Sequence, residues 1–457
     1  MMKTSKSILG IIFVAVALIF QSCTQNDDSI GEIVIEGDTI NNNGGGDNGG
    51  GGEDIVVLSG DINSDLTLEN DTTYELEGGV FVNDGVTLTI EPGTRIIAGN
   101  VNGVFAFLAI RQGGLIDAQG TASNPIVFTS NENTPNPGDW GGLILAGRAP
   151  INRTSTAGGT ATAEVANLTY GGDVPDDNSG ILRYVRLEYT GGQINESSEY
   201  NGLSLYGVGS STTLEYIQAY QGADDGFEFF GGTVNLKYAV ATGSQDDSFD
   251  WTDGWVGNGQ FWIVQQGTIE GDKGIEADNL DGTNDAVPFS YPTISNVTLV
   301  GADDGDGENK GIEFRAGTKV AAYNMIIQNF SEKGIEVDDD QTLLNLNAGE
   351  VEVFNTIINN ENSFDLDHGG SATVDLNDFA TYSNFTLDGT GAPFNTAGNG
   401  IPAGFSLSGF RGTYAYTAGT DGVDNFDPST LGAFFTSAPY AGALSETDTW
   451  TDGWVRL

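Results

Sequence analysis

Short runs of β-branched and aromatic residues alternate with turns rich in Gly, Asn and Asp from Ile55 onward. Leu66-Thr67-Leu68, Val86 to Ile90 and Pro125 to Phe128 are typical of these runs. No long segment after the N-terminal leader has the 3.6-residue apolar periodicity of an amphipathic helix. Strands this short and this closely spaced predict an all-β sandwich, barrel or solenoid.

An internal repeat decides among these folds. A four-residue pattern with one central apolar residue and a terminal acid recurs, and successive copies are 22 to 37 residues apart. The copies are Asp225-Gly-Phe-Glu228, Asp247-Ser-Phe-Asp250, Lys273-Gly-Ile-Glu276, Lys310-Gly-Ile-Glu313, Lys333-Gly-Ile-Glu336 and Asn362-Ser-Phe-Asp365. A period in the low twenties with insertions of variable length is typical of the coils of a parallel β-helix, because insertions map to loops. A propeller blade would need about 40 residues or more.

Three stretches carry a family resemblance. They are DTTYELEGGVFVNDGVTLTIEPGTRIIAG, GDWGGLILAGRAPIN and DDGFEFFGGTVNLKYAVATGSQDDSFDWTDGW. They resemble secreted lipoproteins with a right-handed, pectin-lyase-like parallel β-helix. The resemblance implies a β-helix over residues 54–385, with residues 386–457 forming β-rich loops and a cap of the same domain. It implies fold and export more than activity.

The N-terminus predicts export. Lys3 and Lys6 precede an apolar run at residues 8–20, which is typical of a signal peptide and short for a transmembrane helix. Cys23, the sole cysteine, follows this run, and the arrangement resembles the lipobox of Bacteroidota surface lipoproteins. The resemblance implies a signal peptide at 1–22, lipidation at Cys23 and an outer-membrane location facing the exterior. Residues 23–53, which include NNNGGGDNGGGGE, have almost nothing to pack and predict a flexible, disordered tether.

Charge excludes some partners. The chain has a net charge of −48, and removal of the leader takes away two lysines and no acid, so the mature charge is −50. A polyanion of this size repels nucleic acid and anionic headgroups and attracts divalent cations. With one cysteine, no intramolecular disulfide can form.

Strand alternation predicts a ladder of carboxylates. Phe227 and Phe229 share one face of their strand and Glu228 takes the other. The apolar members of the six copies then stack inside, and the acids Glu228, Asp250, Glu276, Glu313, Glu336 and Asp365 stack outside, about 4.8 Å apart. At that spacing two carboxylates repel by about 0.9 kcal/mol in water, and by more at a partly dry surface.

Two features of the sequence can offset the repulsion between these carboxylates. Lys273, Lys310 and Lys333 precede the third, fourth and fifth acids by three residues and are placed to bridge them. The first two coils lack these lysines and carry further aspartates, which predicts calcium bound by oxygen ligands. The expected ligands are Asp224, Asp225, Glu228, Asp246, Asp247 and Asp250. The alternative is a solvated acidic edge that blocks aggregation.

A second candidate calcium site lies at Asp304, Asp306 and Glu308, whose spacing matches the start of an EF-hand loop. The twelfth position of that loop is Arg315 instead of glutamate. A site there would therefore be partial, and a solvated turn is the alternative.

Catalysis has weaker support. Pectate lyases use calcium and an arginine base, and Arg315 is the one weak candidate; an ion pair within the ladder is the alternative. Asp225, Asp246 and Asp247 resemble the acids of family 28 glycosidases, yet that family's Gly-His-Gly signature is missing. The only histidine, His368, lies several coils away. No catalytic residue is assigned.

The aromatic residues predict a binding surface. Trp-Thr-Asp-Gly-Trp occurs at 251–255 and again at 450–454, with Tyr206, Tyr216 and Tyr220 on nearby strands. Trp251 has the parity of Phe249 and is expected in the core, whereas Trp255 is the candidate for stacking on sugar rings, with a loop or end cap as its alternative. Trp255, Glu276, Glu313 and Glu336 form the expected ligand-binding set.

The sequence therefore predicts a surface lipoprotein whose acidic β-helix binds an extracellular polysaccharide with calcium. By analogy with the family, the protein is also expected to act as an accessory of a TonB-dependent transporter. A calcium-dependent polysaccharide lyase and a structural or adhesive surface protein are the rival functions.

The lipid anchor gives a direct prediction. Cys23→Ser removes the only thiol that can be acylated, so it should abolish lipid labelling and release the protein from the membrane fraction. A variant that still fractionates with the outer membrane would contradict lipidation at this position.

Overall fold

The computed structural model describes most of the chain after residue 54. The described ranges are 55–154, 156–195, 198–267, 271–302, 309–360, 364–366, 407–408, 411–412, 426–445 and 447–456. Several predictions fall outside them, namely the signal peptide, Cys23, the tether, His368 and the loop acids Asp304, Asp306 and Glu308.

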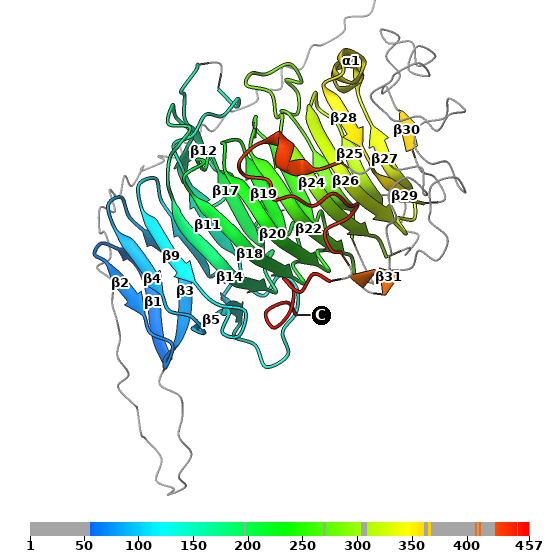
Figure 1. Ribbon diagram of the computed structural model, residues 1–457. Helices are drawn as coiled ribbons and strands as arrows, with labels where there is room; N and C mark the ends of the chain where they lie inside the picture. The colour runs from blue at the N-terminus through cyan, green and yellow to red at the C-terminus, as the bar shows by residue number, and fades with distance from the viewer. Residues whose placement is uncertain are drawn as a thin grey trace, which may run out of the picture. The chain divides into compact units, whose positions relative to one another are not determined.

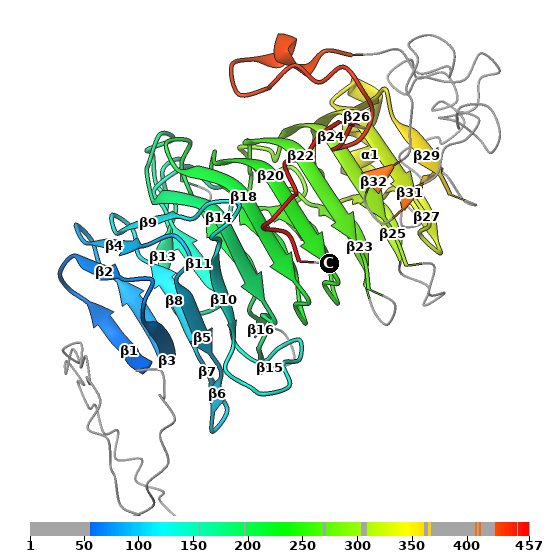
Figure 2. The same ribbon diagram turned by 60° about the horizontal axis from the view of Figure 1, so that its bottom comes forward.

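The chain folds into a parallel β-helix (Figure 1). Within the described ranges, twenty-four strands form one continuous sheet that winds around the core, and every pairing within it is parallel, so each coil lies beside the next. This confirms the predicted all-β solenoid. The sheet has three faces, which Figure 2 shows from a second direction.

The first face, called the site sheet below, carries the recurring four-residue pattern. It begins with the C-terminal halves of β1 (Ile55–Ile62) and β3 (Thr73–Val82). It continues through β8 (Phe107–Ile110), β11 (Leu143–Ala146), β17 (Leu203–Tyr206), β19 (Phe227–Phe230), β21 (Phe249–Thr252), β23 (Lys273–Ala277), β25 (Lys310–Phe314), β27 (Lys333–Val337) and β30 (Phe364–Leu366).

The other two faces share six bent strands. These are β14 (Gly180–Glu188), β18 (Thr213–Tyr220), β20 (Asn235–Thr242), β22 (Asn258–Gln265), β24 (Thr293–Val300) and β26 (Val320–Gln328). The second face adds β5 (Arg95–Ala98), β10 (Ile126–Ser130) and β29 (Ile357–Asn359). The third adds β2 (Leu66–Leu68), β4 (Thr87–Ile90), β9 (Leu115–Gln119) and β28 (Val351–Phe354).

The register of the site sheet matches the predicted stacking. Phe227 pairs with Phe249, Phe249 with Ile275, and Ile275 with Ile312. These side chains are fully buried, and the two phenylalanine rings stack 4.9 Å apart. Each buried side chain of this size contributes roughly 1.5–3 kcal/mol by leaving water. Repetition of that gain on every coil stabilises the fold without a disulfide.

Each bent strand turns through one residue in the left-handed backbone region. Aromatic residues fill this position in the first four strands, and asparagines fill it in β24 and β26. The residues are Tyr184, Tyr216, Tyr238, Phe261, Asn296 and Asn324, with φ between 51° and 61°. The four aromatic rings stack 4.3 to 4.9 Å apart. Ring stacking and asparagine's tolerance of positive φ offset the strain that this conformation costs other residues.

The C-terminal segment, residues 426–445 and 447–456, packs along this row of bends. It contains the 3-10 turn η2 (Pro428–Leu431). Asn296 Nδ2 donates to Ala438 O and Tyr440 O, and Trp454 packs edge-on against Tyr184 and Tyr216. The second Trp-Thr-Asp-Gly-Trp motif therefore covers the flank of the coils.

In the part of the chain that the structure describes, short hairpins and an α-helix project from the coils. The hairpins are β6 (Asn100–Val101) with β7 (Val104–Phe105), β12 (Ala161–Thr162) with β13 (Thr169–Tyr170), β15 (Gln193–Asn195) with β16 (Ser198–Glu199), and β31 (Leu407–Ser408) with β32 (Arg411–Gly412). The helix α1 (Asp340–Ala348) is capped by Asp339, whose carboxylate accepts from two backbone N–H groups. Within the described ranges no helix has the length and apolarity to cross a membrane.

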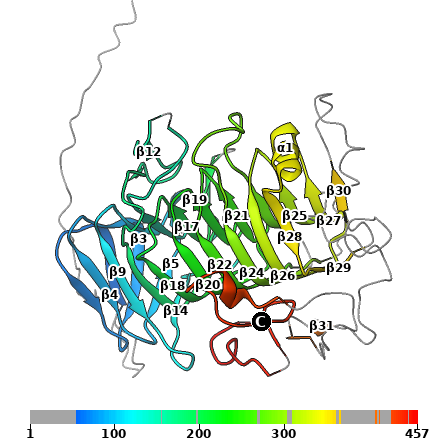
Figure 3. The same ribbon diagram turned by 45° about the horizontal axis from the view of Figure 1, so that its top comes forward.

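The hairpin β12–β13 belongs to a long excursion after β11, residues 148–154 and 156–177, called the insertion below. Figure 3 shows β12 and α1 on one side of the coils and the C-terminal segment on the other. The insertion covers an apolar outer patch of the site sheet, made by Phe107, Ala109, Ile144, Ala146, Tyr206 and Phe230.

Candidate cation site

The predicted carboxylate ladder is present in the described site sheet. Glu228 pairs with Asp250, Asp250 with Glu276, and Glu276 with Glu313. The same row continues through Glu336 to Asp365. Parallel pairing without a register shift forces these like charges onto adjacent coils, where they repel.

Lysines neutralise the later coils of the ladder. Lys310 Nζ lies 2.7 Å from Glu313 and 2.5 Å from Glu336, so one lysine bridges two coils. Lys333 Nζ donates to Asp365 of the next coil at 2.6 Å, whereas Glu336, which it was predicted to bridge, pairs with Lys310. Glu313 and Glu336 are buried beside Lys310. These two predicted ligand-binding glutamates are therefore engaged in ion pairs.

Arg315 is also engaged in ion pairs. Its Nε lies 2.9 Å from Asp278 and 3.0 Å from Glu276. Burial opposes its charged form, but the Asp278 and Glu276 carboxylates outweigh burial and raise the pKa of Arg315 above its ordinary value. A base needs a lowered pKa, so the geometry fits the ion-pair alternative and weighs against Arg315 as a catalytic base.

An acidic groove opens at the first coils of the ladder. Its volume is about 290 Å³. It is lined by Glu164, Ser198, Glu199, Asn201, Asp224, Asp225, Glu228, Asp246, Asp247, Asp250 and Glu276. No Lys or Arg is among these lining residues. All six predicted calcium ligands line the groove. Of the three glutamates predicted to bind a ligand, Glu276 lines it, and Glu313 and Glu336 do not.

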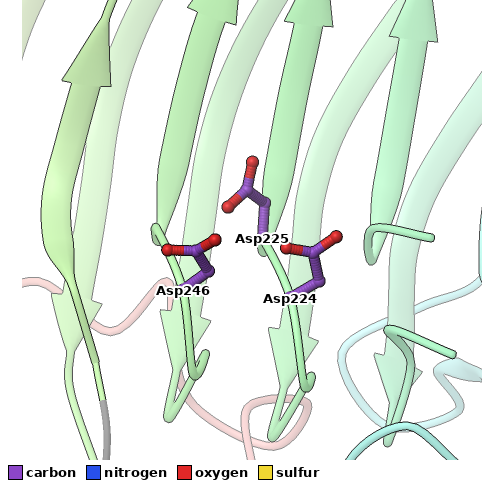
Figure 4. Close-up of side chains that lie close together, drawn as sticks. All are labelled: Asp224, Asp225 and Asp246. Carbon is purple, nitrogen blue, oxygen red and sulfur yellow. The ribbon is translucent and has the colours of Figure 1, made fainter. Parts of the chain in front are cut away.

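The aspartates enter from two parallel turns. Asp224 and Asp225 precede β19, and Asp246 and Asp247 precede β21 one coil later. Asp247 N donates to Asp225 Oδ1 at 2.9 Å, and Lys273 N donates to Asp247 Oδ1 at 2.7 Å. Each buried aspartate thus caps the backbone of the next coil, which fixes its side chain. Figure 4 shows Asp224, Asp225 and Asp246 turned toward one another.

Three overlapping groups of carboxylates are close enough to share ions. Their ligand oxygens lie within 4.8 Å of one another. The groups are Asp224 with Asp225 and Asp246, Asp225 with Glu228 and Asp250, and Asp246 with Asp247 and Asp272. Asp250 Oδ1 and Asp272 Oδ1 are buried and make no hydrogen bond with the described residues, while the other oxygen of Asp272 pairs with Lys273 Nζ. A buried acceptor without a partner is costly, and a cation would satisfy it.

Burial and mutual repulsion raise the pKa values of several acids of the groove. Burial, followed by the charges of Asp246 and Glu199, raises the pKa of Asp224 to about 8. Burial and then Asp272 raise the pKa of Asp246 to about 6, although Lys273 opposes the shift. The pKa values of Asp225 and Glu228 also lie well above their ordinary range, because both are buried beside other carboxylates.

Trp255 corrects one prediction. Its side chain is fully buried, stacks 4.1 Å from Phe229 and donates from Nε1 to Val234 O. β21 ends at Thr252, and the turn through Asp253 and Gly254, which have positive φ, leads the chain back to the core at Trp255. Tyr206 and Tyr220 are also buried. These aromatic side chains cannot present a free stacking face to a sugar.

Glu164, Glu199 and Asn201 are groove residues that the sequence did not predict. Glu164 and Glu199 lie on hairpins outside the repeat, so no periodic signal marks them. Asn201 Nδ2 donates to Glu228 Oε2. The lone signal for Asn201 is its position just before β17, which corresponds to the aspartates that precede β19 and β21.

The metal-free protein should lose stability as pH rises from 5 to 9. Asp224 and Asp246 have folded pKa values of about 8 and about 6, whereas unfolded aspartate titrates near 3.9. A raised folded pKa stabilises at low pH, and this contribution is lost as pH rises through the folded pKa. Melting temperatures in a chelator should therefore fall across this range. Asp224→Asn with Asp246→Asn should flatten the profile; an unchanged slope in that variant would contradict the assignment.

Comparison with known families agrees with the geometry. Residues 60–404 match the family model described as a pectate-lyase-like β-helix domain, which covers well over half of the 457 residues. Neither the curated proteins nor the solved structures give a significant match. A shared fold leaves the chemistry open, because function depends on the site. The chain belongs to the pectate-lyase-like β-helix domain family.

Proposed function

We propose that this protein is a lipid-anchored protein of the outer-membrane surface whose acidic groove binds calcium and, through it, an extracellular polysaccharide. The observation that carries this proposal is the set of carboxylates whose oxygens lie within 4.8 Å of one another around Asp225. Repulsion at this distance is about 0.9 kcal/mol per pair in water and about 3.5 kcal/mol at an effective dielectric constant of 20. A divalent cation converts this repulsion into coordination.

Calcium fits this donor set better than other common ions. The groove offers carboxylates and an asparagine amide but, among its lining residues, no cysteine or histidine. Calcium takes six to eight hard oxygen donors and tolerates irregular geometry, whereas magnesium demands octahedral geometry and retains water. Zinc prefers nitrogen and sulfur ligands.

A polysaccharide would complete the coordination from the open side. Calcium held by residues of one sheet keeps free positions toward solvent, which hydroxyl or carboxylate oxygens can occupy. A carboxylated sugar chain could approach this polyanionic protein only with its charge neutralised by the cation. The chemistry therefore favours an acidic polysaccharide bound through calcium. Service to a TonB-dependent uptake system remains part of the proposal on family analogy.

Lyase activity has less support than binding. Arg315, the weak candidate for the base, is held by Asp278 and Glu276, and no arginine lines the groove in the described part of the chain. Turnover is therefore treated as one outcome of the binding experiment.

Calcium should raise the melting temperature more than sodium chloride of equal ionic strength. Binding to the folded state alone stabilises by RT ln(1 + [L]/Kd), about 2.7 kcal/mol at a hundredfold excess over Kd. Asp225→Asn with Asp247→Asn should remove most of the calcium-specific increase and raise the metal-free melting temperature, because the change relieves repulsion. Asp173→Asn with Asp176→Asn, two exposed acids outside the groove, is the charge-matched control. An equal rise of the melting temperature in both salts would show that the groove is only an acidic edge screened by ions.

Glycan binding can be tested by affinity electrophoresis of the Cys23→Ser protein without its leader. Polygalacturonate in the gel should retard the protein in calcium, and a chelator or the Asp225→Asn/Asp247→Asn variant should abolish the retardation. A neutral glucan serves as the control polymer. Release of an unsaturated product that absorbs in the ultraviolet would establish a lyase instead. Absence of both retardation and turnover would favour a structural or adhesive role.

A further inference from the structure

The first Trp-Thr-Asp-Gly-Trp motif anchors the insertion. Its aspartate, Asp253, follows β21 directly and has a side chain with no exposed surface. Arg153 Nε donates to both Asp253 oxygens at 3.0 and 2.9 Å, and the Tyr170 hydroxyl donates to Oδ2 at 2.6 Å. Arg153 and Tyr170 lie near the two ends of the insertion, so a single buried carboxylate fastens both ends to the site sheet.

Ring contacts connect this anchor to the acidic groove. Tyr170 packs edge-on against Tyr206 at 5.0 Å, and Tyr206 stacks on Phe230 at 4.0 Å. The Tyr206 hydroxyl then donates to Glu164 Oε1 at 3.3 Å. Tyr206 is 1% exposed, so its ring is held by the surrounding packing and its hydroxyl has a fixed position. The position of Glu164 therefore depends on the way the insertion sits on these rings.

Glu164 approaches the site sheet acids from outside the sheet. It lies in the connection between β12 and β13 and lines the groove together with Glu228 and Asp224. Its charge acts on both of these acids. The aspartates and Glu228 all come from the coils, so Glu164 is a carboxylate that reaches the same space from a different structural element.

We propose that the insertion is a fastened wall of the acidic groove, in which Glu164 places a negative charge beside the cation that the site sheet acids bind, and Asp253 is the residue that positions Glu164. This inference rests on the proposed cation-binding function. Asp250 and Asp253 lie three residues apart on and just after β21, so the strand that carries a groove acid also carries the anchor of the opposite wall. That arrangement keeps the distance between the two sides of the site fixed. A site of this kind discriminates between ions by size, because its ligands cannot close around a smaller ion.

A double-mutant cycle measured by calcium titration calorimetry tests this inference. Glu164→Gln and Asp253→Asn should each weaken calcium affinity about tenfold, and the double variant should be no weaker than Glu164→Gln alone, because Asp253 acts through Glu164. Asp173→Asn, which removes one charge from the same insertion outside the groove, should leave affinity unchanged. Tyr206→Phe removes the hydroxyl that holds Glu164 while keeping the ring. It should weaken binding in the wild-type background and have no effect in Glu164→Gln.

The outcomes separate the two proposals. Wild-type protein that binds no calcium would overturn the proposed function and this inference with it. Calcium binding that is unchanged by Glu164→Gln would leave the proposed function standing and overturn the inference. Additive losses in the double variant would show that Asp253 supports the fold without positioning Glu164. If Asp253→Asn fails to fold, the cycle between Tyr206→Phe and Glu164→Gln decides the question by the same criterion.

Discussion

Parallel, in-register stacking of coils is the constraint on which the rest of this structure depends. Each residue of a strand lies about 4.8 Å from its counterpart on the next coil. Any side chain that suits one coil therefore meets a similar neighbour. This benefits Phe227 and Phe249, whose rings stack. It also benefits the tyrosines at the bends, where stacking offsets a left-handed backbone. For carboxylates the same geometry is unfavourable, so each acid of the ladder needs a partner.

The protein answers that requirement in two ways along one sheet. In the later coils Lys310 pairs with Glu313 of its own coil and Glu336 of the next, and these two pairs are largely closed to solvent. Lys333 pairs with Asp365 of the next coil, nearer the surface. In the earlier coils the acids are more numerous and the groove they line contains no basic residue. The same sheet neutralises its later acids with lysines, a few coils further along. The earlier acids lack such lysines and are therefore the proposed ligands of an external cation. This contrast is the reason to propose a cation site in the earlier coils instead of a merely acidic surface.

Repetition determined which parts of the site could be predicted from the sequence. The ladder follows from strand alternation and a repeated motif, and the register confirms it. Trp255 was assigned to the surface wrongly: it has the same odd parity as the buried Phe249 and Trp251, and after the turn at Asp253 and Gly254 its indole packs in the core. Glu164 was missed, because it lies in an insertion that has no counterpart on other coils. Its position depends on the hydrogen bond from the Tyr206 hydroxyl and on the hydrogen bond by which Tyr170 holds the insertion to Asp253, and no local pattern encodes these tertiary contacts.

The outward row of the site sheet explains why the groove lies where it does. From the N-terminal coils the row reads Phe81, Ala109, Ile144 and Ser204, and then Glu228 begins the acids. The apolar part would be unfavourable in water, and the insertion covers it with its own apolar side chains. The acidic part cannot be covered in this way, because burying unpaired charges beneath apolar residues is costly. Along this row the apolar cover ends before the acids, and the polar residues Asn152 and Arg153 carry the insertion on to Asn279 and Asp253. At that boundary the edge of the insertion carries an acid, Glu164. The groove is therefore lined by carboxylates on two sides, from the insertion and from the site sheet.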